Sequence, residues 1–233
     1  MGGAPLMSRS VHPHRDPTLK LYTYFRSSAA YRVRIALNLK GLSYESVPIH
    51  MVREGGQQHS ARYRAVNPQG LVPALELDGH VLIQSLAICE YLEERFPEPP
   101  LLPTDPLERA YVRAIAATVA CEMHPLNNLR VLQYLTGPLE QKAEVRTDWY
   151  RHWIATGFQA IEAILTRGRR SGRFCLRDRP TLADVFLVPQ VANALRFECP
   201  MEDYRTISRI NAECLELPAF DAARPERQPD VEP

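Results

Sequence analysis

The hydrophobic pattern of the chain changes at one proline-rich stretch, EPPLLPTDP, at residues 98–106. Before this stretch, short runs of β-branched and aromatic residues alternate with runs of helical spacing, whereas after it only helical spacing occurs. This order predicts an α/β part followed by a separate all-α part. We therefore expect a mixed domain over residues 20–97, a linker over 98–106 and a helical domain over 107–217.

The first part is expected to form a small mixed sheet covered by helices. A strand, a helix and a second strand follow in quick succession, an order typical of a right-handed βαβ unit with parallel strands. Asp78-Gly79 lies between two alternating runs and predicts a two-residue hairpin turn. The expected elements are strands over 20–25 and 43–49, a helix that Gly41 ends after Lys40, a loop over 50–58, a short helix over 59–66, and a helix over 85–96 capped by Ser85.

The second part is expected to hold helices only. Thr181 and Asp184 have the spacing of a capping box, which marks the start of one of them. Both ends of the chain are polar and proline-bearing, so we expect residues 1–19 to be a disordered extension or tag remnant and 218–233 to be a surface tail. The expected helices span 107–135, 140–167, 181–197 and 204–216.

The composition excludes several classes of protein. Lysine and arginine number 28 against 27 aspartates and glutamates, so no basic field points to nucleic acid or a membrane surface. No apolar run is long enough to span a membrane. The five cysteines are scattered without metal-ligand spacing, which predicts free thiols, no metal site and a cytoplasmic protein. Cys89 and Cys121 lie within apolar runs and are expected in the core.

Ser27 and Ser28 stand where the first strand gives way to the first helix, directly after Arg26. The unpaired N–H groups and the positive dipole end of a helix start favour an anion. A serine hydroxyl at such a place can also donate a hydrogen bond to a thiolate and lower the pKa of the thiol. Because serine is a common helix cap, the pattern leaves open whether the pair binds an anion or only caps the helix.

Two further dipeptides lie at strand ends. Val72-Pro73 opens a strand, and a trans bond is the commoner state, while a cis bond would turn the Val72 backbone groups toward a peptide-like ligand. Gln84-Ser85 follows a strand and precedes a helix, so the pair either caps the helix or offers an amide and a hydroxyl to a carboxylate.

Arg26, Arg130 and Arg196 are far apart in the sequence. Arginine pairs with carboxylates through two parallel hydrogen bonds, so three converging arginines would form a dicarboxylate site, whereas each alone is typical of the surface. His124, in HPLNN, is more often a structural hydrogen-bonding residue than a catalyst in such a setting.

A set of segments spread over roughly residues 20–230 carries a family resemblance. The segments are YFRSSAAYRVRIALNLKG, GGQQ, NPQGLVPALELDG, IQSLAICEYLEE, HPLNN, LADVFLVPQVANALRF and RQPD. Together they resemble the zeta class of glutathione transferases, and within it the maleylacetoacetate and maleylpyruvate isomerases. The resemblance implies a thioredoxin-like domain that binds glutathione, a helical domain that closes over a small diacid, and a homodimer.

The resemblance also implies roles for single residues. Ser27 matches the hydroxyl that stabilises the glutathione thiolate, with Ser28 and Ala29 in the same turn. Arg26 and Arg196, with Arg130, match arginines that hold substrate carboxylates, so the catalytic set would be Ser27, Ser28, Arg26 and Arg196. The remaining glutathione-binding positions would be Gln58, Val72 beside a cis Pro73, Gln84, Ser85, His124 and Asn128.

The chain departs from the family at Ala29, where most zeta proteins carry a cysteine. This change and Arg130 resemble maleylpyruvate isomerases, while GGQQ and the serine pair resemble the maleylacetoacetate branch. The implied activity is a glutathione-dependent cis–trans isomerisation of a maleyl diacid in aromatic catabolism. The alternatives are a general transferase acting on haloacids or other electrophiles, and a non-catalytic module that binds other proteins.

Overall fold

The computed structural model describes residues 18–231, so most of the predicted amino-terminal extension lies outside the described part. Four strands form one mixed sheet in the order β2-β1-β3-β4. β1 (Leu19–Thr23) pairs parallel with β2 (Tyr44–Pro48) and antiparallel with β3 (Ala74–Leu77). β3 in turn pairs antiparallel with β4 (His80–Ile83). The predicted mixed sheet with one parallel pair is therefore confirmed.

The ends of these elements follow from local sequence. Asp78 and Gly79 have positive φ angles of 49° and 80°, as the predicted two-residue hairpin turn requires. Gly41, with φ at 65°, ends the first helix as expected. β1 starts one residue before the predicted strand because Leu19 is buried and pairs with Tyr44.

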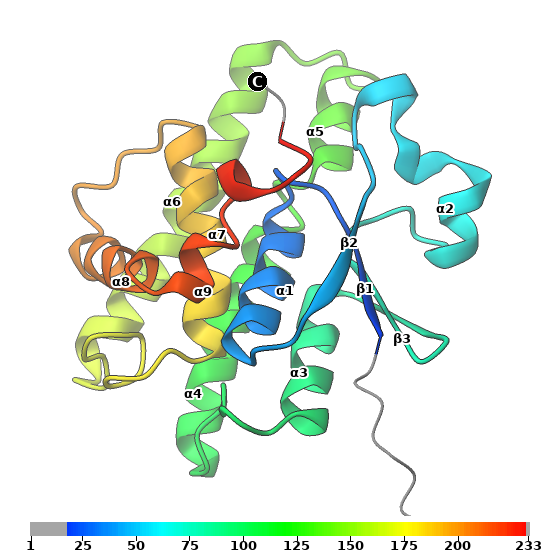
Figure 1. Ribbon diagram of the computed structural model, residues 1–233. Helices are drawn as coiled ribbons and strands as arrows, with labels where there is room; N and C mark the ends of the chain where they lie inside the picture. The colour runs from blue at the N-terminus through cyan, green and yellow to red at the C-terminus, as the bar shows by residue number, and fades with distance from the viewer. Residues whose placement is uncertain (1–17, 232–233) are drawn as a thin grey trace, which may run out of the picture.

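Helices cover both faces of the sheet (Figure 1). α1 (Ser28–Leu39) and α3 (Ser85–Arg95) lie on one face, and the short α2 (Ala61–Val66) lies beyond the other. α1 lies between the sheet and the helical part, which explains why its first ten residues are buried on every side of the helix. Two 3₁₀ turns, Arg53–Gly55 and Gln57–His59, interrupt the predicted loop.

The second part contains only helices among the described residues. Its hydrophobic core is continuous with that of the sheet, since one cluster of buried residues includes side chains from both parts. α7 packs against α1 and so joins the two parts. The helices are α4 (Pro106–Ala117), a π-helical turn (Thr118–Met123), α5 (Leu129–Thr136), α6 (Ala143–Arg167), α7 (Leu182–Arg196), α8 (Arg205–Leu215), α9 (Pro218–Asp221) and a 3₁₀ turn (Pro225–Arg227).

The prediction of one helix over 107–135 is wrong, because the run divides into α4, the π-helical turn and α5. Pro125 lacks a backbone N–H and interrupts the helix, and the Asn128 side chain accepts from the Arg130 N–H at 3.2 Å to start α5. Cys121 is exposed rather than in the core, because the wider π-helical turn rotates it outward while Val119 and Met123 stay buried. Cys89 is buried as expected.

The capping box at the start of α7 is confirmed. The Asp184 carboxylate accepts hydrogen bonds from the Thr181 N–H at 2.8 Å and from the Thr181 hydroxyl at 2.9 Å. Its other oxygen accepts from the Cys175 N–H at 2.8 Å. A local sequence pattern thus also fixes the loop that precedes the helix.

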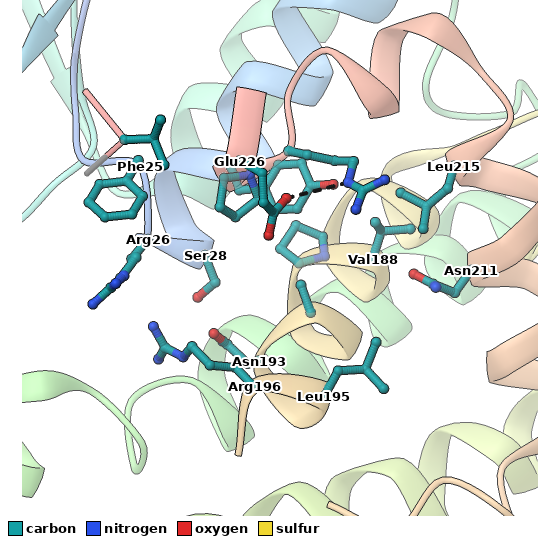
Figure 2. A pocket seen from close by; sticks show the side chains of 16 residues that line it. Phe25, Arg26, Ser28, Val188, Asn193, Leu195, Arg196, Asn211, Leu215 and Glu226 are labelled. Atoms are coloured by element: carbon teal, nitrogen blue, oxygen red, sulfur yellow. Dashed lines mark ion pairs between the residues drawn. The ribbon is translucent and has the colours of Figure 1, made fainter. Parts of the chain in front are cut away.

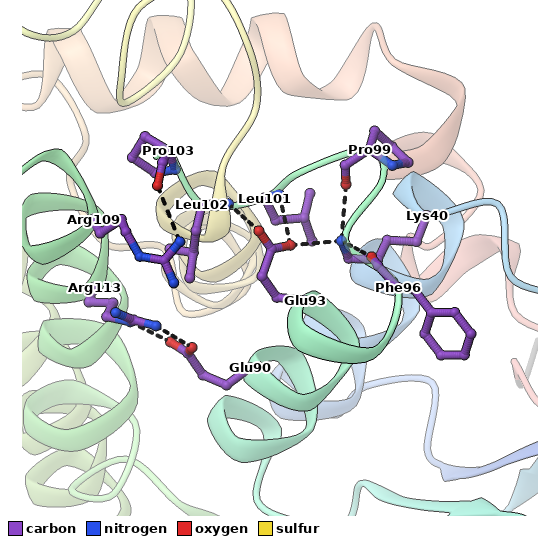
Figure 3. A network of polar contacts seen from close by, with 10 residues as sticks. All are labelled: Lys40, Glu90, Glu93, Phe96, Pro99, Leu101, Leu102, Pro103, Arg109 and Arg113. Carbon is purple, nitrogen blue, oxygen red and sulfur yellow. Dashed lines mark hydrogen bonds and ion pairs between the residues drawn. The ribbon is translucent and has the colours of Figure 1, made fainter. Parts of the chain in front are cut away.

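A buried polar network ties the proline-rich stretch to the sheet-covering helices (Figure 3). Lys40 Nζ lies 2.7 Å from Glu93 Oε2 and also donates to the Phe96 and Pro99 carbonyls. The Glu93 carboxylate accepts from the Leu101 and Leu102 N–H groups, each at 2.9 Å. The stretch between the two parts is therefore held in one position.

The expectation of a surface tail after residue 217 is wrong for much of its length. Phe220 and Ala223 are fully buried. Arg34, on α1, donates to the Ala223 carbonyl at 3.0 Å, and the Phe25 N–H donates to Asp230 Oδ2 at 2.9 Å. The end of the chain therefore returns to the start of α1, where the serine pair lies (Figure 1).

Candidate active site

The start of α1 is built around Ser27, which caps the helix. Its Oγ accepts from the Ala30 N–H at 3.2 Å, and its own N–H donates to the Tyr24 carbonyl at 2.9 Å. The capping interpretation is confirmed for Ser27. A hydroxyl that accepts one hydrogen bond can still donate its proton, so capping leaves Ser27 able to stabilise an anion.

Ser28 connects α1 to the helical part of the chain. Its Oγ lies 3.2 Å from Nδ1 of His124, which follows the π-helical turn. Burial, reinforced by the positive charges of Arg32 and Arg130, lowers the pKa of His124 to about 3. The imidazole is therefore neutral at physiological pH, and it shares one hydrogen bond with the serine hydroxyl.

A cavity of about 400 Å³, here called the α3 cavity, lies between the start of α3 and the π-helical turn. Eight of the residues predicted from the sequence line it: seven of the ten expected to bind glutathione, and Arg130, which was expected to bind the diacid. They are Ala29, Val72, Pro73, Gln84, Ser85, His124, Asn128 and Arg130.

The Val72-Pro73 peptide bond in this cavity is cis. The loop before it is held by two bonds to the Leu71 carbonyl, from the Tyr63 hydroxyl and the Asn67 amide, each at 2.7 Å. Backbone groups in this position are fixed without help from a ligand, which suits recognition of a peptide-like molecule.

The start of α3 differs from the expected cap. Gln84, with φ at 69°, is the capping residue, and Ser85 is the first residue of the helix. The Gln84 amide donates to Gln69 Oε1 at 2.7 Å, and Ser85 Oγ accepts from Arg32 Nη1 at 3.2 Å. Both side chains are thus positioned by partners other than the helix backbone, and the prediction of Ser85 as the cap is wrong.

A second cavity of about 400 Å³, here called the α7 cavity, adjoins the first. Leu71, Val72, His124 and Asn128 line both cavities. Ser27, Ser28 and Arg26 line the α7 cavity from the start of α1, and Arg196 lines it from the end of α7. Two arginines from distant parts of the chain are therefore brought to one cavity.

Figure 2 shows Arg26 and Arg196 beside Ser28, around the space between α1 and α7. Within residues 18–231 neither guanidinium is paired with a carboxylate; each packs over a neighbouring ring, Phe25 or Phe197, at 4.9 Å from the centroid. The same two arginines also line a further cavity of about 450 Å³, which reaches the end of the chain at Glu226 and Val231 and is the cavity drawn in Figure 2. Two cations without a carboxylate partner make the α7 cavity favourable for a dianion.

Two predicted residues lie apart from the others. Arg130 lines the α3 cavity and not the α7 cavity, so it is not brought together with Arg26 and Arg196. Gln58 lines neither cavity; its side chain is buried and donates to the Met51 carbonyl at 3.1 Å.

Several residues that line the two cavities are not among those predicted from the sequence. Arg32, Asn67 and Gln69 line the α3 cavity, and Arg146 and Asn193 line the α7 cavity. Asn67 and Gln69 belong to the NPQG segment before Val72. An asparagine in such a turn often hydrogen-bonds the backbone two residues later, so this pattern could have identified both positions. Arg146 and Asn193 are brought in only by helix packing.

Among residues 18–231, no group of three or more metal-ligating side chains gathers, and no helix is long and apolar enough to cross a membrane.

Comparison with known proteins agrees with this geometry. Residues 21–100 match the family described as glutathione S-transferase, N-terminal domain. A probable maleylacetoacetate isomerase of Vibrio cholerae is 51% identical over 92% of this chain and 99% of its own.

Two solved structures extend the similarity to the fold. The holo structure of a bacterial zeta-class maleyl pyruvate isomerase is 46% identical, with a TM-score of 0.89 over 91% of this chain and all of that one. A maleylacetoacetate isomerase from Anaeromyxobacter dehalogenans, with glutathione bound in its active site, is 45% identical, with a TM-score of 0.84 over 94% of this chain and all of that one. With the glutathione transferase fold established and relatives of this similarity along nearly its whole length, the chain belongs to the maleylacetoacetate/maleylpyruvate isomerase family of zeta-class glutathione transferases.

Proposed function

We propose that this protein is a glutathione-dependent cis–trans isomerase of a maleyl-type diacid. The observation that carries the proposal is the pair of adjoining cavities, one fitted to a peptide and the other to a dianion. Ser27 and Ser28 line the second cavity, and His124 and Val72 line both. A thiol from a molecule in the α3 cavity would thus meet a diacid in the α7 cavity.

The residues of the α3 cavity fit glutathione. The backbone of Val72 beside the cis Pro73 offers a donor and an acceptor to the cysteinyl unit, and Gln84 and Ser85 offer donors to a carboxylate. Arg32, which lines the same cavity, has Nε and Nη2 without partners although both are buried. An anionic peptide would bind the donors at the start of α3 and supply the negative charge that Arg32 lacks, and Arg130 would act on this peptide rather than on the diacid.

Glutathione, when bound, supplies a thiolate that adds reversibly to the double bond of the substrate and so allows that bond to rotate. Ser27 donates its hydroxyl proton toward that sulfur from the start of α1, where the helix dipole also favours negative charge. Ala29 lies in this turn, so the chain offers no thiol of its own there.

Arg26 and Arg196 bind the two carboxylates of the diacid in the α7 cavity. Because both are already in place and neither is paired with a carboxylate, they stabilise negative charge that develops on the substrate with little rearrangement. Asn193, one turn before Arg196, lines the same wall. A general transferase for apolar electrophiles would gain nothing from this charge, which favours the isomerase.

We also propose the assembly and location that the family resemblance implies. The protein forms a homodimer, which light scattering of the purified chain would test. It acts in the cytoplasm, consistent with five cysteines that are all unpaired.

The deciding experiment is a glutathione-dependent assay in which one preparation is given maleylpyruvate or maleylacetoacetate. We expect isomerisation of at least one, with no turnover when glutathione is left out. The ratio of kcat/KM values identifies the physiological diacid. Turnover of haloacids with no isomerisation of either diacid would contradict the proposal and favour a general transferase.

A further inference from the structure

The first turns of α1 carry two buried arginines that differ in how many hydrogen-bond partners the protein gives them. Arg34 is fully buried, and its guanidinium donates to the Ala223, Tyr24 and Phe25 carbonyls and to the Thr23 hydroxyl. Its hydrogen-bonding capacity is used by the protein itself. Arg34 therefore has a structural role, holding the end of the chain against α1.

Arg32 has almost no such partners. It is 1% exposed, and among the described residues its guanidinium donates only from Nη1 to Ser85 Oγ, at 3.2 Å, while Nε and Nη2 have no hydrogen-bond partner. No carboxylate in residues 18–231 pairs with it; the Phe186 ring, 4.8 Å from Cζ, gives a weaker cation–π contact. A buried charge without a partner is costly, so a position like this is destabilising unless a ligand completes it.

The groups around Arg32 do not neutralise it. Burial lowers the pKa of its guanidinium to about 10, so it keeps its charge at physiological pH. Burial also raises the pKa of the Cys89 thiol to about 12, and His124 is neutral, so neither supplies a negative charge. Arg130 and the exposed Cys121, which line the same cavity, add a second cation and one thiol. The α3 cavity is thus positively charged in the free protein.

We infer that Arg32 is a positioning residue for an anionic group of the peptide bound in the α3 cavity, acting through Ser85. The inference rests on the proposed function. Because Arg32 donates to Ser85 Oγ, that oxygen is occupied as an acceptor and its O–H is free to donate to a carboxylate at the start of α3. The guanidinium strengthens this bond by charge, and the ligand carboxylate supplies the counter-ion that the protein lacks.

The test couples a change in the protein to a change in the ligand. Arg32→Met removes the charge and keeps most of the side-chain length, and 4-aminobutyryl-cysteinyl-glycine is glutathione without the carboxylate of its γ-glutamyl unit. We expect calorimetry to show that wild type binds glutathione about tenfold or more tightly than this analogue, and that the ratio falls toward one in Arg32→Met. Arg95→Met, which removes an exposed charge from the other end of α3, should keep the wild-type ratio.

A second measurement needs no ligand. Without glutathione, Arg32→Met should unfold at a urea concentration equal to or above that of wild type, because it removes an uncompensated buried charge. Arg34→Met, which breaks satisfied hydrogen bonds, should unfold at a clearly lower concentration.

Two outcomes would overturn the inference and leave the proposed function intact. In one, Arg32→Met prefers glutathione over the analogue by the same factor as wild type. In the other, Arg32→Met is destabilised as much as Arg34→Met. A wild-type protein that binds neither peptide would overturn both.

Discussion

Ser28 Oγ lies 3.2 Å from Nδ1 of His124, and this bond joins the start of α1 to the helical part at the boundary between the two cavities. His124 is neutral there because burial opposes its charged form and Arg32 and Arg130 repel it. The protonation of His124 therefore affects the hydrogen bond that joins α1 to the helical part of the chain.

The first prediction concerns stability at acid pH. The folded protein holds the pKa of His124 at about 3, below the ordinary value of 6.5, so only the unfolded chain binds a proton there between these values. This contribution to stability is fully present above pH 6.5 and is lost as the pH falls toward 3, by at most about 1.4 kcal/mol per pH unit. Urea unfolding of wild type and His124→Asn at several pH values measures it.

The difference between the two proteins isolates His124 from the other groups that titrate in this range. We expect the free energy of unfolding of wild type to fall more steeply than that of His124→Asn between pH 6.5 and 4. Parallel curves would mean that His124 is protonated equally easily in the folded and unfolded states.

The second prediction separates the two roles of Ser27. Ser27→Ala removes the helix cap, which costs about 1 kcal/mol of stability, and also the donor that faces the thiolate. We expect kcat to fall about tenfold or more, while the dissociation constant of glutathione changes less. Ser27→Thr keeps both the cap and the hydroxyl and should stay closer to wild type in kcat. An unchanged kcat in Ser27→Ala would remove this hydroxyl from the reaction.

The third prediction separates the three arginines. Arg196→Ala and Arg26→Ala each remove a charged partner of the diacid, so the apparent KM for the diacid should rise by about 10- to 100-fold. Arg130 lines the other cavity, so Arg130→Ala should instead weaken glutathione binding and leave the KM for the diacid nearly unchanged. Steady-state kinetics with each substrate varied in turn distinguishes the two patterns, and a KM for the diacid that is unaltered in Arg196→Ala would exclude Arg196 from its site.

The parts of the fold that the sequence predicts are those that depend on neighbours along the chain. The Asp78-Gly79 turn, the end of α1 at Gly41 and the capping box at Thr181 are each determined by a few adjacent residues. The sequence does not predict the division of the run over 107–135, because helical periodicity continues through the π-helical turn and only packing shows which face of that turn is buried.

Some residues of the site can likewise be predicted from their neighbours along the chain, and others cannot. Ser27 and the Gln84-Ser85 pair stand at strand-to-helix junctions and can be found locally, whereas the meeting of Arg26 with Arg196 depends on α7 packing against α1. Arg32 and Arg34 differ in role although they are two positions apart. The sequence cannot separate them, because the carbonyls that satisfy Arg34 come partly from the returning end of the chain.

The last prediction compares two ion pairs on α3, both drawn in Figure 3. The Lys40–Glu93 pair is almost fully buried, and it holds the proline-rich stretch, whereas the Arg113–Glu90 pair is partly exposed. Lys40→Met leaves a buried carboxylate without its cation and should lower the free energy of unfolding by about 3–5 kcal/mol, while Arg113→Met should cost less than about 1 kcal/mol.

Neither Lys40 nor Glu93 lines the α3 or α7 cavity, so the glutathione affinity of the folded Lys40→Met protein should match that of wild type. Equal losses in the two variants, measured by urea unfolding, would show that burial adds nothing to the Lys40–Glu93 pair and that the stretch is held by its apolar contacts alone.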